Sequence, residues 1–257
     1  MILEPNPKLN IGLNVLGKRP DGYHDLETLF VPWFGVKDVL EIEESGEGRG
    51  VVDIEITGPS FDWDARRDLT VRAYELLDAD FHLPSVRMKL QKNIPVGAGL
   101  GGGSADAAFT LRALSEMFAL GLSDESLAGY ASVLGADCAF FIYNRPMFGR
   151  GKGDLLEPFD IDLSAFDIRV EIPDGVAVST KEAYAGIVPH LPSMPLAELL
   201  KQSPDKWQGT VVNDFEKSVF AVHPEIEALK RRFLDEGAVY ASMSGSGSSV
   251  FGLFRAG

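Results

Sequence analysis

Five glycines lie within ten residues of this chain, between Pro95 and Ser104. Glycine tolerates positive φ angles and lets another group approach the backbone closely. The residues after Ser104 are rich in Ala and Leu and predict a helix that begins at this serine. Unpaired N–H groups and the positive end of the dipole make a helix N-terminus attractive to anions. The segment therefore predicts a loop that binds phosphate groups.

The glycine run fits three alternative types of loop less well. A plain turn needs only one or two glycines, and a Walker loop is excluded because no lysine occupies the required position. Gly97, Gly99 and Gly102 satisfy the short dinucleotide pattern. The strand before them is amphipathic, however, and the repeated βαβ halves of dinucleotide-binding folds are missing. A nicotinamide-dependent oxidoreductase remains an open but weaker alternative.

The elements that must position this loop alternate between strands and helices, which predicts an α+β fold. A polar stretch with glycines joins the second and third expected strands, and it predicts a hairpin between them. In chain order, the hydrophobic patterns and turn signals predict strands at Leu9–Val15, Val39–Glu43 and Val51–Thr57, a helix around Leu69–Leu77, a strand at Val86–Lys92, helices at Ser104–Leu120 and Asp124–Leu134, a strand at Ile168–Ile172, a helix at His223–Glu236 and a strand at Ser249–Phe254.

Composition narrows the classes of function. With 257 residues and 45% hydrophobic side chains, the chain can bury a core without disulfides, and its single cysteine allows no internal one. A net charge of -14 argues against broad binding of nucleic acid, so an anionic ligand must be held by local groups. We expect a cytoplasmic protein with no targeting or membrane segment. Four scattered histidines and one thiol predict no protein-built metal site.

Three motifs together resemble the GHMP kinases. The segment Pro95–Ala108, PVGAGLGGGSADAA, is similar to their ATP-binding signature, and similar N-terminal and C-terminal motifs lie at Pro7–Asn10 and Ser244–Gly247. The resemblance implies a kinase that uses ATP and Mg²⁺. It also implies a two-domain fold with the substrate between the domains. The expected domains are an N-terminal one like the second domain of ribosomal protein S5, residues 1–157, and a ferredoxin-like C-terminal one, residues 158–257.

A narrower likeness points to the substrate. The segments Gly17–His24, Leu134–Asp137 and Asn213–Glu216 resemble the branch of GHMP kinases that phosphorylates a cytidine diphosphate-linked methylerythritol in isoprenoid biosynthesis. Another GHMP kinase, acting on homoserine, a sugar or mevalonate, is disfavoured by the Asp-Gly-Tyr-His element of the first segment. A catalytically silent GHMP-fold ligand sensor is disfavoured by the presence of Lys8 and Asp137.

The resemblance assigns the chemistry to Asp137 and Lys8. A hydroxyl group that attacks a γ-phosphoryl group must lose its proton, and Asp137 is expected to accept that proton. Lys8 is expected to lie beside Asp137, to keep the carboxylate ionised and to neutralise charge on the transferring group. Taken without the resemblance, such an aspartate is more often a helix cap or solvated, and such a lysine is more often on the surface.

The substrate-binding residues are expected to come from the branch motif and from one later segment. Tyr23 and His24 are expected to bind cytosine, because a base can stack on an aromatic ring while its edge takes hydrogen bonds. Tyr184 is expected to close a sandwich around the base, Thr180 lies four residues before it, and Asn10 is expected to contact the substrate. Alternatively, Tyr23 is a turn aromatic on the core and His24 a structural histidine.

The remaining expectations concern the nucleotide. Ser104 is expected to help the ATP phosphates hold Mg²⁺, which usually keeps waters and few protein ligands. The related kinases commonly have Asn-Leu where this chain has Asp68 and Leu69, so its base preference stays open, because an ionised aspartate cannot donate a hydrogen bond. Cys138 is expected to be a buried apolar residue rather than a nucleophile. The residues expected to contact ATP are Gly97, Ala98, Gly99, Leu100, Gly101, Gly102, Gly103, Ser104, Ala105, Asp106 and Ala107.

Overall fold

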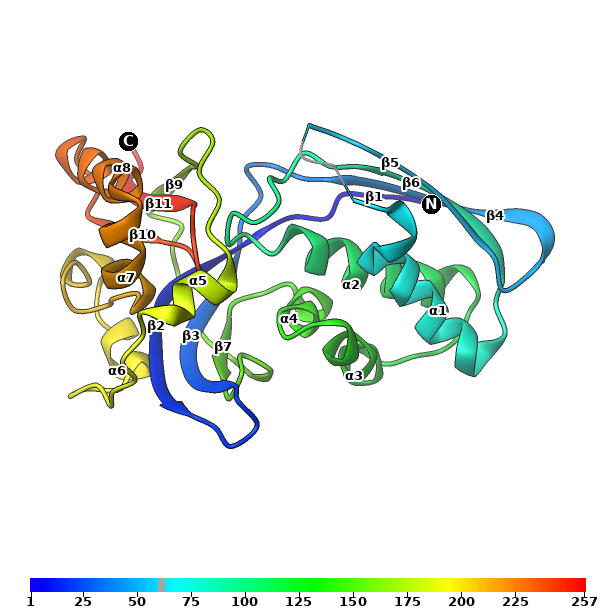
Figure 1. Ribbon diagram of the computed structural model, residues 1–257, viewed down its shortest axis with the longest axis horizontal. Coiled ribbons are helices and arrows are strands. Elements are labelled where there is room, and N and C mark those ends of the chain that lie inside the picture. The colour runs from blue at the N-terminus through cyan, green and yellow to red at the C-terminus, as the bar shows by residue number, and fades with distance from the viewer. Residues whose placement is uncertain (60–62) are drawn as a thin grey trace. The chain divides into compact units, whose positions relative to one another are not determined.

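The computed structural model describes residues 1–59 and 63–257, which form two compact units of mixed helix and strand (Figure 1). Each unit is assembled from separate stretches of the chain, and the glycine loop contributes residues to both. The predicted boundary at residues 157 and 158 stays a prediction. The first unit comprises Met1–Lys8, Pro32–Val96 and Gly101–Arg145, and the second comprises Leu9–Val31, Gly97–Leu100 and Pro146–Gly257.

The first unit contains a four-stranded sheet with the order β1-β4-β6-β5. Its strands are β1 (Ile2–Leu3), β4 (Val39–Arg49), β6 (Pro84–Gln91) and β5 (Val52–Thr57). The predicted hairpin between β4 and β5 is wrong, because β6 lies between them, antiparallel to β4 and parallel to β5. Parallel strands need a crossover connection, and α1 (Leu69–Phe81) provides it between β5 and β6.

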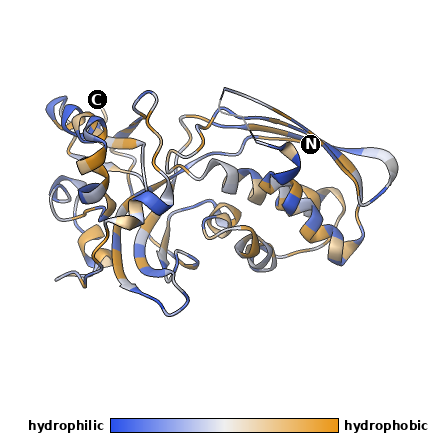
Figure 2. Cartoon of the chain, viewed as in Figure 1, coloured by the Kyte–Doolittle hydropathy of each residue, from blue (hydrophilic) through white to orange (hydrophobic). Residues whose placement is uncertain are grey.

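The helices of the first unit pack beside this sheet. They are η1 (Ala65–Arg67), α1, α2 (Gly102–Met117), α3 (Asp124–Leu134) and α4 (Cys138–Tyr143). The α2 helix begins before the predicted Ser104, because Gly101, with φ of +73°, ends the loop and serves as its N-cap. Ser123 caps α3, since its hydroxyl accepts a hydrogen bond from the Ser126 amide. Figure 2 shows that α1 and α2 carry both hydrophobic and hydrophilic residues, as amphipathic helices do.

The second unit contains two sheets. The four-stranded sheet has the order β2-β3-β7-β8, and the end residues Lys8 and Pro32 of its first two strands are counted with the first unit. The three-stranded sheet, with the order β10-β11-β9, pairs antiparallel throughout. The strands are β2 (Lys8–Lys18), β3 (His24–Pro32), β7 (Met147–Arg150), β8 (Leu155–Pro158), β9 (Phe166–Glu171), β10 (Tyr240–Met243) and β11 (Val250–Arg255).

The helices of the second unit cover a core built around the three-stranded sheet. Ile226, Leu229 and Phe233 recur at helical spacing on α8 and are buried in that core. The helices are α5 (Thr180–Ala185), α6 (Leu196–Leu200), η2 (Pro204–Lys206), α7 (Phe215–Val222) and α8 (Pro224–Asp235). Across the described ranges of both units, none of the helices has the length and apolar character needed to cross a membrane.

Candidate active site

Lys8 and Asp137 are in contact within the first unit, as predicted. The Lys8 Nζ atom lies 3.3 Å from Oδ2 of Asp137. Asp137 stands at the start of α4 but its side chain makes no capping hydrogen bond there. The Lys8 side chain is 4% exposed and that of Asp137 is 33% exposed. The pair therefore presents a carboxylate to solvent and keeps its cationic partner behind it.

The helix side of the glycine loop faces this pair. A Cβ atom at Gly101 would lie 3.1 Å from ring carbons of Phe141 and 3.2 Å from Cε of Lys8. The φ of +73° at Gly101 also favours glycine. Gly103, in contrast, is exposed, and the nearest atom to a Cβ placed there is Cδ1 of Leu69 at 3.8 Å. The first turn of α2 is therefore open on the side of Gly103.

Ser104, in the same turn, is a neighbour of the Cys138 thiol and lowers the pKa of that thiol. Burial raises the pKa of that thiol to about 11, and Asp137 raises it as well, while Ser104 and Arg72 lower it. Cys138 is thus a buried, protonated thiol rather than a nucleophile. Arg72, on α1, is a cation whose charge acts on the same thiol. In residues 1–59 and 63–257, no group of three or more His, Cys, Asp or Glu is placed to hold a metal ion.

The later residues of the predicted ATP-binding set lie inside the first unit. Ala105, Asp106 and Ala107 are at most 1% exposed. The Asp106 carboxylate accepts a hydrogen bond from the Lys92 ammonium group instead of facing solvent. These residues can contribute to ATP binding through the position of α2, and their assignment as direct contacts stays a prediction.

Asp68, where the kinases that this sequence resembles commonly have asparagine, acts as the N-cap of α1. Its Oδ1 atom accepts hydrogen bonds from the amide and the hydroxyl of Thr70, at 2.9 and 2.8 Å. Its Oδ2 atom accepts one from the Trp63 indole at 3.2 Å. Aspartate is among the best N-cap residues, so this substitution serves the helix. Both carboxylate oxygens are engaged within the protein.

The strand side of the glycine loop rests on the C-terminal motif, within the second unit. A Cβ atom at Gly99 would lie 2.1 Å from the Ser244 carbonyl oxygen, so only glycine fits there. The Ser244 hydroxyl donates to the Gly99 carbonyl at 3.2 Å, and the Ser249 amide donates to the Ala98 carbonyl at 3.1 Å. The C-terminal motif therefore supports the loop.

The motif at Asn213–Glu216 supports the C-terminal motif in turn. The Asn213 amide group donates to the carbonyl oxygens of Met243 and Gly245, at 2.8 and 2.9 Å. Glu216 accepts from the Met243 amide at 2.9 Å. Buried backbone groups need such partners. The motif at Asn213–Glu216 therefore fixes the C-terminal motif, which lies against Gly99.

The rings of His24, Tyr184 and Phe215 form an aromatic cluster in the second unit, which also contains the predicted Tyr23. The rings of His24 and Tyr184 stack with centroids 4.7 Å apart and an interplanar angle of 22°. Tyr184 also meets Phe215 edge to face at 4.8 Å. Tyr23 is 60% exposed, and the ammonium group of Lys152 lies 4.9 Å from its ring centroid. His24 and Tyr184 are therefore in direct contact, with no third ring between them.

The other two predicted substrate residues differ in exposure. Asn10 is 2% exposed, and its side-chain amide donates to the Thr28 hydroxyl at 3.0 Å. Thr180 is exposed in the first turn of α5. It lies four residues before Tyr184 and thus on the same side of the helix. Their contact with substrate stays a prediction.

Sequence comparison decides the family. Residues 68–145 match the pattern of the GHMP kinases N terminal domain, and residues 194–256 match that of the GHMP kinases C terminal. A Bacteroides fragilis protein named 4-diphosphocytidyl-2-C-methyl-D-erythritol kinase is 48% identical over 254 residues, which cover 99% of this chain and 92% of that protein. The chain belongs to the GHMP kinase family.

Further relatives of this GHMP kinase agree with the fold. A Bacteroides thetaiotaomicron protein with the same name is 49% identical over 255 residues, covering 99% of this chain and 92% of that protein. A crystal structure of 4-(cytidine 5'-diphospho)-2C-methyl-D-erythritol kinase matches with a TM-score of 0.77 and 34% identity, over 98% of this chain and 90% of that one. The predicted α+β GHMP kinase fold is confirmed.

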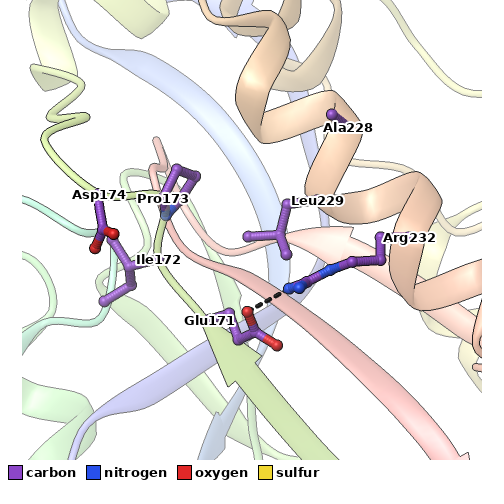
Figure 3. A pocket seen from close by; sticks show the side chains of 7 residues that line it. All are labelled: Glu171, Ile172, Pro173, Asp174, Ala228, Leu229 and Arg232. Carbon is purple, nitrogen blue, oxygen red and sulfur yellow. Dashed lines mark hydrogen bonds and ion pairs between the residues drawn. The ribbon is translucent and has the colours of Figure 1, made fainter.

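One hollow of this GHMP kinase lies apart from all the predicted residues. It has a volume of about 420 Å³, and Figure 3 shows it in the second unit, between the end of β9 and α8. An ion pair joins two of its lining residues, Glu171 and Arg232. It is lined by Glu171, Ile172, Pro173, Asp174, Ala228, Leu229 and Arg232.

The sequence patterns did not predict where several charged side chains of this GHMP kinase lie. Arg72 gave no signal beyond its place on an amphipathic helix, one turn after Asp68. Lys152 stands between two glycines in the turn that joins β7 to β8, which signals only an exposed basic turn. Lys92 ends an amphipathic strand, where a lysine normally faces water, but here it is 2% exposed.

Proposed function

We propose that this GHMP kinase transfers the γ-phosphoryl group of ATP to the 2-hydroxyl group of 4-diphosphocytidyl-2-C-methyl-D-erythritol, in the non-mevalonate route to isoprenoids. The relatives that match nearly the whole chain carry the name of this activity. The observation that carries the chemistry is the contact of Lys8 with Asp137 beside the first turn of α2. The chain thus retains the two groups that phosphoryl transfer to an alcohol requires.

Asp137 acts as the general base in this proposal. Its carboxylate is partly exposed, so a substrate hydroxyl group can reach it and give up its proton as the new O–P bond forms. Lys8 lies behind the carboxylate and neutralises negative charge on the transferring phosphoryl group. Because phosphoryl transfer depends mainly on position and electrostatics, a fixed pair of this kind suits the reaction.

ATP is held by backbone groups in this proposal. The unpaired amides in the first turn of α2 and the positive end of its dipole bind the phosphate groups. Mg²⁺, when bound, would offset phosphate charge and would be held mainly by those phosphates and water, with the Ser104 hydroxyl as a protein ligand. That hydroxyl fits the role, because Ser104 is half-buried in the first turn of α2 and its oxygen carries two lone pairs.

The cytidine end of the substrate is bound by Tyr23 and by the aromatic cluster. Tyr23 is exposed and offers a stacking face, and Lys152 places positive charge beside it. The contact between His24 and Tyr184 means that the base stacks on an outer face of this pair, or that the two rings separate to admit it. We assign Thr180 and Asn10 to substrate contact as well.

We also assign this kinase to the cytoplasm. Its one cysteine is buried and free, as is common for proteins that work in a reducing compartment.

The proposed function is tested by measuring ADP release with different alcohols. Purified protein is incubated with ATP, Mg²⁺ and, in separate reactions, the cytidyl substrate, homoserine or mevalonate, with an Asp137→Asn protein as control. We expect ADP release with the cytidyl substrate alone. Release driven by homoserine or mevalonate would replace the substrate assignment. ATP binding without turnover of any alcohol would favour the silent ligand sensor.

A further inference from the structure

Three charged side chains meet inside the first unit. Asp38, Lys92 and Asp106 have side-chain exposures of 0%, 2% and 1%. The Lys92 ammonium group donates to Oδ2 of both aspartates. Charged side chains are almost never fully buried unless they are paired, and burying them is costly. A buried network of this kind therefore calls for a reason beyond core packing.

The network joins the two flanks of the glycine loop. Asp38 accepts hydrogen bonds through Oδ1 from the amides of Asn93 and Ile94, at 2.5 and 2.7 Å, and so fixes the turn just before the loop. Asp106 lies in the second turn of α2, just after the loop. Lys92 reaches from the first flank to the second. The chain that enters the loop is thereby tied to the helix that leaves it.

Packing at Gly102, the first residue of α2, also ties the helix to the segment before the loop. A Cβ atom at Gly102 would lie 2.9 Å from Cγ2 of Ile94 and 3.4 Å from Nζ of Lys92. The start of the helix thus rests directly on the turn that Asp38 holds. A change in the network would shift the first turn of α2, where we propose that the phosphate groups bind.

We propose that Asp38, Lys92 and Asp106 form a buried clamp that positions the first turn of α2 for the phosphate groups of ATP. They are positioning residues, because none of the three side chains reaches the surface. The role given to ATP rests on the proposed function.

Electrostatics argues against a purely stabilising network. Burial lowers the pKa of Lys92, but Asp106 and Asp38 together raise it further, so Lys92 is an ammonium group. Burial is also the main cause that raises the pKa of Asp106. Oδ1 of Asp106 has no hydrogen-bond partner among the described residues. Apolar or neutral side chains often stabilise a core as well as buried ions do, so stability alone gives no reason to keep an unpaired carboxylate oxygen.

The first test is Asp106→Asn, which keeps the shape of the side chain and changes its charge. The control is Asp78→Asn, because Asp78 accepts from the Leu83 amide at 2.7 Å, at the opposite end of β6 from Lys92. For Asp106→Asn we expect kcat/KM for ATP to fall roughly 10- to 100-fold, as a small misplacement can cause. The KM for the alcohol substrate should stay unchanged. The Asp78→Asn protein should keep the wild-type kcat/KM for ATP, even if its unfolding temperature falls.

Two further measurements keep the proposal testable if the Asp106→Asn protein does not fold. A triple variant, Asp38→Asn, Lys92→Met and Asp106→Asn, leaves no unpaired buried charge, and we expect it to fold and to bind ATP more weakly in isothermal titration. In wild-type protein, we expect the amides of residues 105–108 to resist hydrogen exchange before ATP is added. Wild-type ATP affinity in both folded variants would overturn the clamp, as would exchange protection that arises only after ATP binds.

Failure of the clamp can be told apart from failure of the proposed function. Titration with ATP needs no alcohol substrate. A wild-type protein that binds ATP but does not phosphorylate the cytidyl substrate would overturn the function and leave the clamp open to the same test.

Discussion

Gly103→Ala should make this kinase more stable and at the same time weaken its binding of ATP. Gly103 is the second residue of α2, and its φ does not require glycine. A Cβ atom there would meet only Cδ1 of Leu69, at 3.8 Å, an ordinary van der Waals distance. Alanine in place of glycine in a helix gains about 0.5–1 kcal/mol. Nothing within the protein therefore opposes the substitution.

The loss of ATP affinity should come from a clash between the new methyl group and ATP, and not from a change in the protein. The added methyl group would stand at the open first turn, where we propose that a phosphate oxygen approaches the amides. Loss of one hydrogen bond to a charged group costs about 1.5–3 kcal/mol, which weakens Kd by roughly 10- to 150-fold. Isothermal titration with ATP measures the affinity, and thermal unfolding without ATP measures the stability.

Gly129→Ala provides the matched control. Gly129 lies within α3, and a Cβ atom there has nothing within 4 Å. We expect a similar gain in stability and unchanged ATP affinity. A Gly103→Ala protein that binds ATP as tightly as wild type would refute the placement of phosphate at the first turn of α2.

Other predictions test the chemistry and the substrate end. Asp137→Asn should lower kcat by about 10²–10⁴-fold with little change in KM, and its combination with Lys8→Met should be less than additive in steady-state kinetics, as for groups that act together. Tyr23→Ala should raise KM for the cytidyl substrate by the loss of one stack, about 1–3 kcal/mol, and titration should show intact ATP affinity. Cys138, whose pKa burial raises to about 11, should resist iodoacetamide at pH 8 in the folded protein, and rapid labelling seen by mass spectrometry would contradict its burial.

Local patterns predicted many single elements but missed others, such as β3, β7 and α7, and they gave one wrong pairing. The helix α3 has the predicted bounds, because its capping serine and its stop at Gly135 are both local signals. The hairpin of β4 with β5 was wrong, although the turn residues between them are real. Which strand lies beside β4 depends on the later strand β6, whose apolar side chains, such as Met88, compete for the same place. A hydrophobic pattern within one short segment holds no information about a strand that comes later in the chain.

The candidate site shows the same division. The resemblance predicted that Lys8 lies beside Asp137, and the two side chains are in contact although they are far apart in the chain. Asp38 and Lys92 gave no signal, because a buried ion pair leaves no periodic pattern and charged residues are expected at the surface. Tyr184 was expected on the other side of a base from Tyr23 and His24, but its direct stack on His24 was not predicted, since residue types do not specify which rings touch.

The glycines of the loop are kept for different reasons, and this decides where a ligand can be detected by mutation. Gly99 must be glycine because the C-terminal motif passes within 2.1 Å of its Cβ position. Gly101 has positive φ, and a Cβ atom there would lie close to the Lys8 side chain. A side chain at this position would therefore disturb catalysis and binding together. Gly97 has open space but a φ of +74°, which strains any other residue. Only Gly103 among these four is free of both constraints, so a loss of ATP affinity on its substitution reports on the phosphate rather than on the fold.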